Sequence, residues 1–208
     1  MNESNSLKKT KVLVGMAIFT ALVVVLQLLA GSIKIGPFSP SLVLIPIVIG
    51  AAVYGWKAGA WLGFVFAVVV LIACVTGQDA GGYLMWSTNP LATALIVIIK
   101  GTAAGVLAAL AYRLFGKKNQ LVGTVAAAVV CPVVNTGLFC VGSAMVFKPL
   151  LMEWAAGWWS TQPQMSGEVN LIVYLILGMV GLNFLIEMLI NVVLSPVVVR
   201  ILRARKAV

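Results

Sequence analysis

Two ionisable residues, Lys100 and Glu187, interrupt long apolar stretches of the sequence and are the first candidates for function. A charged side chain inside a bilayer costs roughly 2.5 to 3.5 kcal/mol on insertion scales, so such residues usually serve a function. Lys100 lies on the order of 14 Å below the start of its predicted span, which is too deep for easy snorkelling. It could bind a substrate carboxylate or form a structural ion pair with Glu187, and we favour the carboxylate.

Glu187 is one of four polar residues spaced four apart, with Asn183, Asn191 and Ser195. This spacing keeps the four side chains near one face of a helix. For Asn191 and Ser195, hydrogen bonding between helices is the better interpretation. Asn183 and Glu187 could equally form the floor of a cavity.

Further candidates lie in the fifth apolar stretch and in the loop after the third. Asn135 follows Pro132 by three residues, and the proline frees a backbone carbonyl one turn earlier. The amide of Asn135 therefore either binds a ligand or satisfies the proline kink. Tyr83, Trp86 and Asn89 could form a lid over an outer pocket, although an interfacial aromatic belt explains any single one of them as well.

The elements that must position these residues are membrane helices, since 62% of the 208 residues are hydrophobic and only 9% are charged. A soluble domain carries about a quarter charged residues, and one helical crossing takes roughly 20 apolar residues. The sequence predicts an all-α membrane protein that forms one domain over residues 1–208. Its second span is short and contains Pro46, so we expect a kinked helix or one that begins inside the preceding loop. The six predicted transmembrane helices cover residues 12–30, 41–54, 57–76, 91–115, 121–147 and 169–199.

The basic residues predict that both termini are cytoplasmic. Of the 14 basic residues, 11 lie at the N-terminus, in the turns near Lys57 and Lys117, or in the C-terminal tail. The opposite loops, including residues 77–90 and 148–168, hold only Lys34 and Lys148. Cytoplasmic segments are enriched in Lys and Arg, so the net charge of +9 reflects orientation in a lipid bilayer and not binding to nucleic acid.

Several kinds of chemistry are disfavoured by the residues that are missing. Histidine, the commonest general base and metal ligand, is absent, and no glycine-rich phosphate loop occurs. Cys74, Cys131 and Cys140 match neither a metal-binding pair nor a disulfide framework. We therefore expect no metal site, no cofactor and no enzymatic activity, with energy supplied by an ion gradient or by another subunit.

Several short motifs together resemble the S-component, the substrate-binding membrane subunit of energy-coupling factor (ECF) vitamin transporters. The similarity extends over essentially the whole chain and is greatest to the branch that holds the pantothenate and riboflavin subunits. The residues that carry it are Ala17-x-x-x-Ala21, Ile35-Gly-Pro-Phe-Ser-Pro40, Leu44-Ile-Pro-Ile-Val-Ile-Gly-Ala51, Asn135 and Asn183-Phe-Leu-Ile-Glu187.

The resemblance implies a multi-pass protein of the bacterial plasma membrane that binds one vitamin in an outward pocket. It implies that the protein topples in the membrane when docked, through Ala17 and Ala21, on a transmembrane coupling subunit driven by two cytoplasmic ATPases. Pantothenate subunits place a basic residue and an asparagine where this chain has Lys100 and Asn135. The basic residue of those subunits is an arginine, and Lys100 offers a point charge in place of its bidentate fork.

Other substrates and other classes of protein remain as alternatives. Riboflavin would call for stacking around a flat ring system, whereas pantothenate requires one cation and several hydroxyl or amide partners, and the sequence offers the second set more plainly. A nucleobase-like or sugar-like substrate is a further alternative. A stand-alone ion-coupled secondary transporter would also need deep charged residues, although it usually shows repeat symmetry.

Overall fold

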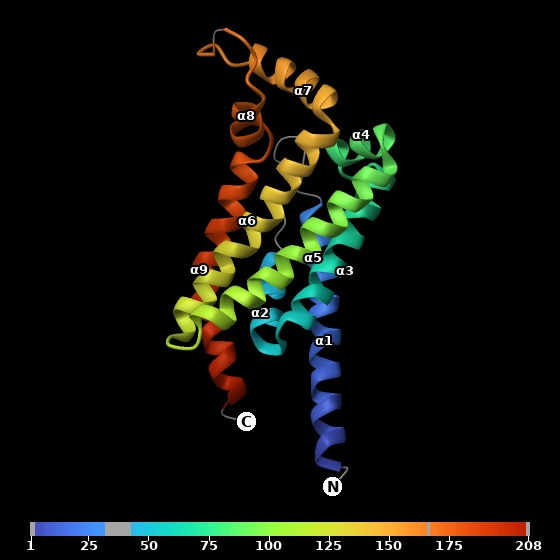
Figure 1. Cartoon of the computed structure of the whole chain (residues 1–208). Helices are drawn as coiled ribbons and strands as arrows, with labels where there is room; N and C mark the ends of the chain where they lie inside the picture. The colour runs from blue at the N-terminus through green and yellow to red at the C-terminus, as the bar shows by residue number, and fades with distance from the viewer. Residues whose placement is uncertain (1–2, 32–42, 166, 207–208) are drawn as a thin grey trace.

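The computed structural model describes residues 3–31, 43–165 and 167–206, and within these ranges the chain is helical without any strand. Figure 1 shows the helices gathered into one elongated bundle. The elements are α1 (Glu3–Ala30), α2 (Leu44–Tyr54), α3 (Trp56–Thr76), α4 (Ala80–Thr88), α5 (Pro90–Phe115), α6 (Gln120–Val146), α7 (Lys148–Ser160), α8 (Leu171–Val173), the π-helical turn η1 (Tyr174–Met179) and α9 (Gly181–Lys206).

Within the described residues, five helices are long and apolar enough to cross a membrane, where the sequence predicted six. They cover Ser6–Ala30, Trp56–Thr76, Pro90–Phe115, Gln120–Val146 and Gly181–Arg200.

The predicted second span is the short apolar helix α2, whose 11 residues extend about 16 Å at 1.5 Å per residue. A hydrocarbon core is about 30 Å thick, so α2 alone does not cross it. Pro46 is the third residue of α2, where its missing N–H needs no helical partner, so the proline marks the first turn and does not require a kink. Residues 41–42, Lys34 and the 35–40 motif lie outside the described residues.

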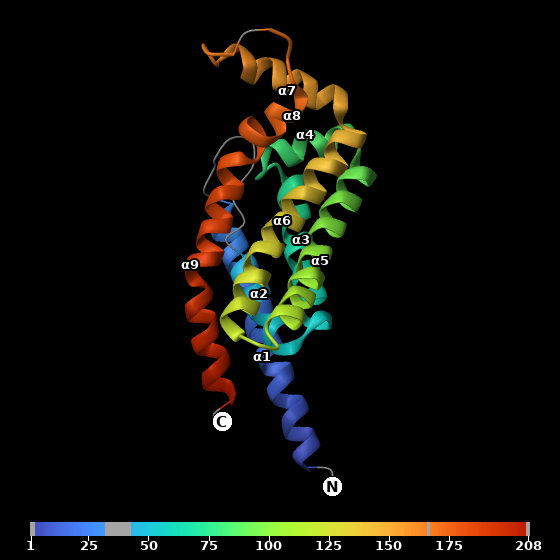
Figure 2. The ribbon, with the colours of Figure 1, turned by 60° about the vertical axis from the view of Figure 1, so that its left-hand side comes forward.

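Both ends of the chain lie at one end of the bundle, and α4, α7 and α8 lie at the other (Figures 1 and 2). We expect the end that holds the termini to be cytoplasmic, as the basic residues predict. On that assignment α4, α7 and α8 cover the outer end of the protein.

The helices α3 and α5 cross closely because glycines face each other at the contact. A Cβ atom on Gly63 would meet the carbonyl oxygen of Gly101, and one on Gly59 would meet that of Gly105. Small residues at such a spacing let two backbones approach. The core next to this contact is formed by residues of α2 and α3 such as Ile47, Leu62 and Phe66, all fully buried.

The two outer segments that the sequence predicted as loops contain helices. After α3 ends at Gly77, in the left-handed conformation (φ 76°), the carboxylate of Asp79 accepts a hydrogen bond from the backbone N–H of Gly82 and caps α4. Met85 of α4 and Leu151 of α7 are buried in one apolar cluster at this end. This end of the bundle is therefore a packed layer.

The last predicted span, 169–199, is interrupted. Asn170 caps α8 by accepting from the N–H groups of Ile172 and Val173, and a π-helical turn follows. The N–H of Val180 bonds the carbonyl of Leu175 over 3.2 Å, and α9 begins at Gly181. π-Helical turns inside helices frequently mark functional sites. This break lies beside the cavity described next.

Candidate functional site

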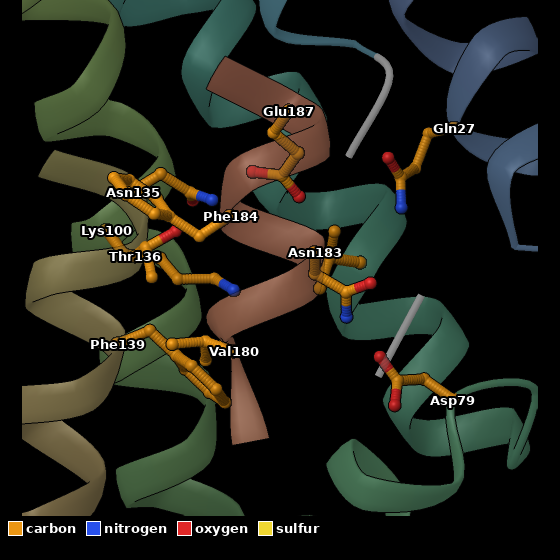
Figure 3. A pocket seen from close by; sticks show the side chains of 11 residues that line it. Gln27, Asp79, Lys100, Asn135, Thr136, Phe139, Val180, Asn183, Phe184 and Glu187 are labelled. Carbon is orange, nitrogen blue, oxygen red and sulfur yellow. The ribbon is translucent and has the colours of Figure 1, made fainter. Parts of the chain in front are cut away.

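A polar cavity of about 50 Å³ lies inside the bundle, among α1, α3, α5, α6 and α9. Its lining is unusual for a membrane interior, because most of the side chains carry polar or charged groups. Figure 3 shows these side chains. The lining consists of Gln27, Val70, Asp79, Lys100, Asn135, Thr136, Phe139, Val180, Asn183, Phe184 and Glu187.

Lys100 contributes the positive charge of the cavity. It is the eleventh residue of α5, about 15 Å along the helix from Pro90. Its Nζ lies 4.3 Å from the ring centroid of Phe139 on α6, within the range of a cation–π interaction. In Figure 3 its side chain extends toward α9. The aromatic ring holds the ammonium group at the cavity wall, where the ammonium group can bind an anion.

Asn135 supplies a buried amide beside Lys100. The residue is 4% exposed, and its Oδ1 accepts no hydrogen bond from the described part of the chain. Leaving a buried acceptor without a partner costs about 1–3 kcal/mol. A ligand that donates to this oxygen would recover that free energy. Pro132, one turn earlier on α6, is also buried.

The polar stripe of α9 divides into two parts with different surroundings. Asn183 and Glu187 are buried and line the cavity. The side chain of Asn191 donates to the carbonyl of Glu187 (2.7 Å), and Ser195 donates to the carbonyl of Asn191 (3.0 Å). These two bonds run within α9, where the sequence had suggested bonds between helices. Such bonding to the carbonyl one turn earlier is common for short polar side chains.

The three residues proposed as a lid lie outside this cavity, at the end of the bundle away from the termini (Figure 1). Tyr83 on α4 is 46% exposed, Trp86 is partly exposed, and Asn89 is exposed. The carboxamide oxygen of Asn89 accepts from the N–H of Ala92 and caps α5, which explains this residue structurally. Their role as a lid stays a prediction.

Among the polar lining residues, Gln27, Asp79 and Thr136 were not sequence candidates. Gln27 is 7% exposed on α1, and a single glutamine within an apolar span is the signal that could have identified it. Asp79 had been assigned to an outer loop, and the glycines that follow it could have indicated a helix cap that places its carboxylate near the bundle.

Ala17 and Ala21 lie on the exposed side of α1, away from the cavity. Exposed apolar residues such as Ile18 (55%) and Val25 (52%) accompany them on this helix. The surface is apolar, as a lipid-facing or helix-docking surface would be. Docking of a partner on it stays a prediction.

Comparison with known proteins supplies the family. Residues 11–199 match the family described as ECF transporter, substrate-specific component. The chain is 26% identical over 195 residues to the pantothenic acid transporter PanT of Lactococcus lactis subsp. cremoris (strain MG1363), covering 88% of this chain and 89% of that protein. Comparison with solved structures gave no match. Because several of its helices are long and apolar enough to cross a membrane, the protein is a multi-pass protein of the cell membrane. The chain belongs to the substrate-specific component family of ECF transporters.

Proposed function

We propose that this protein binds pantothenate, or a closely related vitamin with a carboxylate, from the outer side of the membrane. The observation that carries the proposal is the cavity in which the Lys100 ammonium group and the buried amide of Asn135 lie together. The relative from Lactococcus lactis, named as a pantothenic acid transporter, supports the same substrate. The carboxylate of the ligand would bind Lys100, and its other polar groups would bind polar lining residues such as Asn135, Asn183 and Glu187.

The chemistry of the lining fits such a ligand. A hydrogen bond to a charged group contributes about 1.5–3 kcal/mol, and water is excluded from a buried site, which strengthens the attraction between Lys100 and a carboxylate. The neighbouring amides offer both donors and acceptors. A ligand with one anion and several hydroxyl or amide groups matches this set better than an apolar molecule does.

The site must widen when the ligand binds. A volume of about 50 Å³ suits only a few water molecules, and pantothenate is larger. We expect the wall at Val180 to move, because the regular hydrogen bonding of the last span is interrupted there. Tyr83, Trp86 and Asn89 would then close the outer end as a lid.

Delivery of the vitamin would require partners. The protein would dock through Ala17 and Ala21 on a transmembrane coupling subunit, and two cytoplasmic ATPases would supply the energy. Both alanines are exposed on α1, which leaves room for a partner helix to approach closely. The S-component itself would bind and carry the vitamin without catalysing a reaction.

The first test is mass spectrometry of the small molecule that co-purifies with the detergent-extracted protein, followed by titration with pantothenate and riboflavin. Co-purified pantothenate and saturable binding would support the proposal. Binding of riboflavin instead would refute the assigned pocket chemistry. In liposomes, uptake should require the coupling subunit and ATP, and uptake driven by an ion gradient alone would refute the coupled mechanism.

A further inference from the structure

A second polar compartment adjoins the Lys100 cavity. It has a volume of about 60 Å³ and lies between the end of α1, the end of α3 and the start of α4. It shares Gln27, Val70 and Asp79 with the first cavity, so these three residues form the junction between the two. Its remaining lining comes from Leu28, Gly31, Val69, Ile72, Ala73 and Gln78.

Gln27 is the polar residue at this junction that local structure does not explain. It is 7% exposed, and its Oε1 accepts no hydrogen bond from any described residue. A buried acceptor without a partner costs about 1–3 kcal/mol, whereas a leucine would pack at this place without that cost. The side chain also has three rotatable bonds, so it can turn and join the two compartments.

The two sides of the joined space differ in charge. Figure 3 shows Lys100 and Asn135 on one side, Gln27 and Asp79 on the other, and Asn183 between them. The Lys100 side presents a cation. The other side presents acceptors, because Gln27 offers its amide oxygen and the carboxylate of Asp79, which caps α4, has capacity for more than one donor.

We propose that Gln27 determines specificity by binding the hydroxyl end of the ligand, whose carboxylate lies at Lys100. The ligand would span both compartments, since each is large enough for only a few water molecules. The site thus selects molecules that carry an anion at one end and hydrogen-bond donors at the other. This inference rests on the proposed function, because it takes pantothenate as the ligand and assigns its orientation.

The test compares three ligands by calorimetry with the purified full-length protein in detergent. They are pantothenate, pantothenol, in which an alcohol replaces the carboxylate, and a pantothenate analogue without the two hydroxyl groups. Gln27→Leu should weaken pantothenate and pantothenol equally, by about tenfold, and leave the deoxy analogue unchanged. Lys100→Met should instead abolish the preference for pantothenate over pantothenol. Gln120→Leu makes the same chemical change at the opposite end of the bundle and should alter none of the three affinities.

The outcomes separate the orientation from the function. Two results would refute the role of Gln27 in recognising hydroxyl groups while the proposed function stands. Gln27→Leu could bind all three ligands with the affinities of the unmodified protein, or it could lose as much affinity for the deoxy analogue as for pantothenate. If the unmodified protein binds neither pantothenate nor pantothenol, the proposed function itself fails. Gln27→Glu keeps an acceptor oxygen and should retain the preference for the hydroxylated ligands, which tests the role even where Gln27→Leu folds poorly.

Discussion

Replacing Lys100 by methionine removes the one cation that lines the described cavity and keeps nearly the same side-chain length. The proposed site predicts that this variant binds pantothenate weakly although it folds as well as the unmodified protein. The two effects have opposite physical causes. The ligand loses a charge-assisted hydrogen bond, whereas the empty protein loses a cation that the membrane interior disfavours.

The size of each effect follows from the surroundings of Lys100. A hydrogen bond to a charged group contributes about 1.5–3 kcal/mol, which corresponds to a loss of affinity of about 10-fold to 100-fold. The cation–π contact with Phe139, with Nζ 4.3 Å from the ring centroid, contributes about 0.5–2 kcal/mol and is lost as well. Burying an ammonium group costs several kcal/mol, so the empty variant should be at least as stable as the unmodified protein.

The assay pairs calorimetric titration with pantothenate and thermal unfolding of the empty protein in the same detergent. Lys148→Met is the matched control, because Lys148 is exposed at the start of α7 and lines none of the cavities described above. Its affinity should equal that of the unmodified protein. Unchanged affinity in Lys100→Met would refute the carboxylate site. A markedly lower melting temperature of the empty variant would show that Lys100 is a structural residue, through an ion pair such as that with Glu187.

Three further predictions test other parts of the structure. Leucine at Ala17 and Ala21 should abolish uptake in proteoliposomes and leave pantothenate affinity unchanged, because both alanines are exposed on α1, and a loss of binding would mean that they pack internally. Glu187→Gln removes the charge of an acceptor that the proposed site places against the ligand and should weaken pantothenate binding roughly three- to tenfold, on the order of 1 kcal/mol, in calorimetry at neutral pH; stronger binding would mean that the carboxylate repels the ligand and accepts no hydrogen bond from it. Gly63→Val should lower stability by about 1–3 kcal/mol in thermal unfolding, because the added side chain would meet the backbone of α5. Gly137→Ala, with open space at its Cβ, should change stability little. Equal effects of the two variants would contradict the close packing of α3 and α5.

Much of the site was predictable because charge and depth in the membrane are properties of a sequence. Lys100 and Glu187 were identified by the cost of burying a charge, and both line the cavity. Asn135 and Asn183 were identified by their position within apolar spans, and they line it too. Gln27 was missed because a neutral amide is far less costly than a charge, so it gives a weaker signal in a hydrophobic stretch.

The amino-acid sequence by itself was enough to predict the helical class, the membrane location and the main charged residues of the site. These follow from apolar length and from the cost of placing polar groups in lipid, which do not depend on how helices are arranged. The structure alone decided that α2 begins at Leu44, that the predicted outer loops fold as α4 and α7, and that the last span breaks at Val180. Those features arise from caps and from packing between distant segments. For the same reason, only the fold could bring Gln27 of α1 and Asp79 before α4 to the cavity of Lys100, since they are separated in sequence and meet through tertiary contacts.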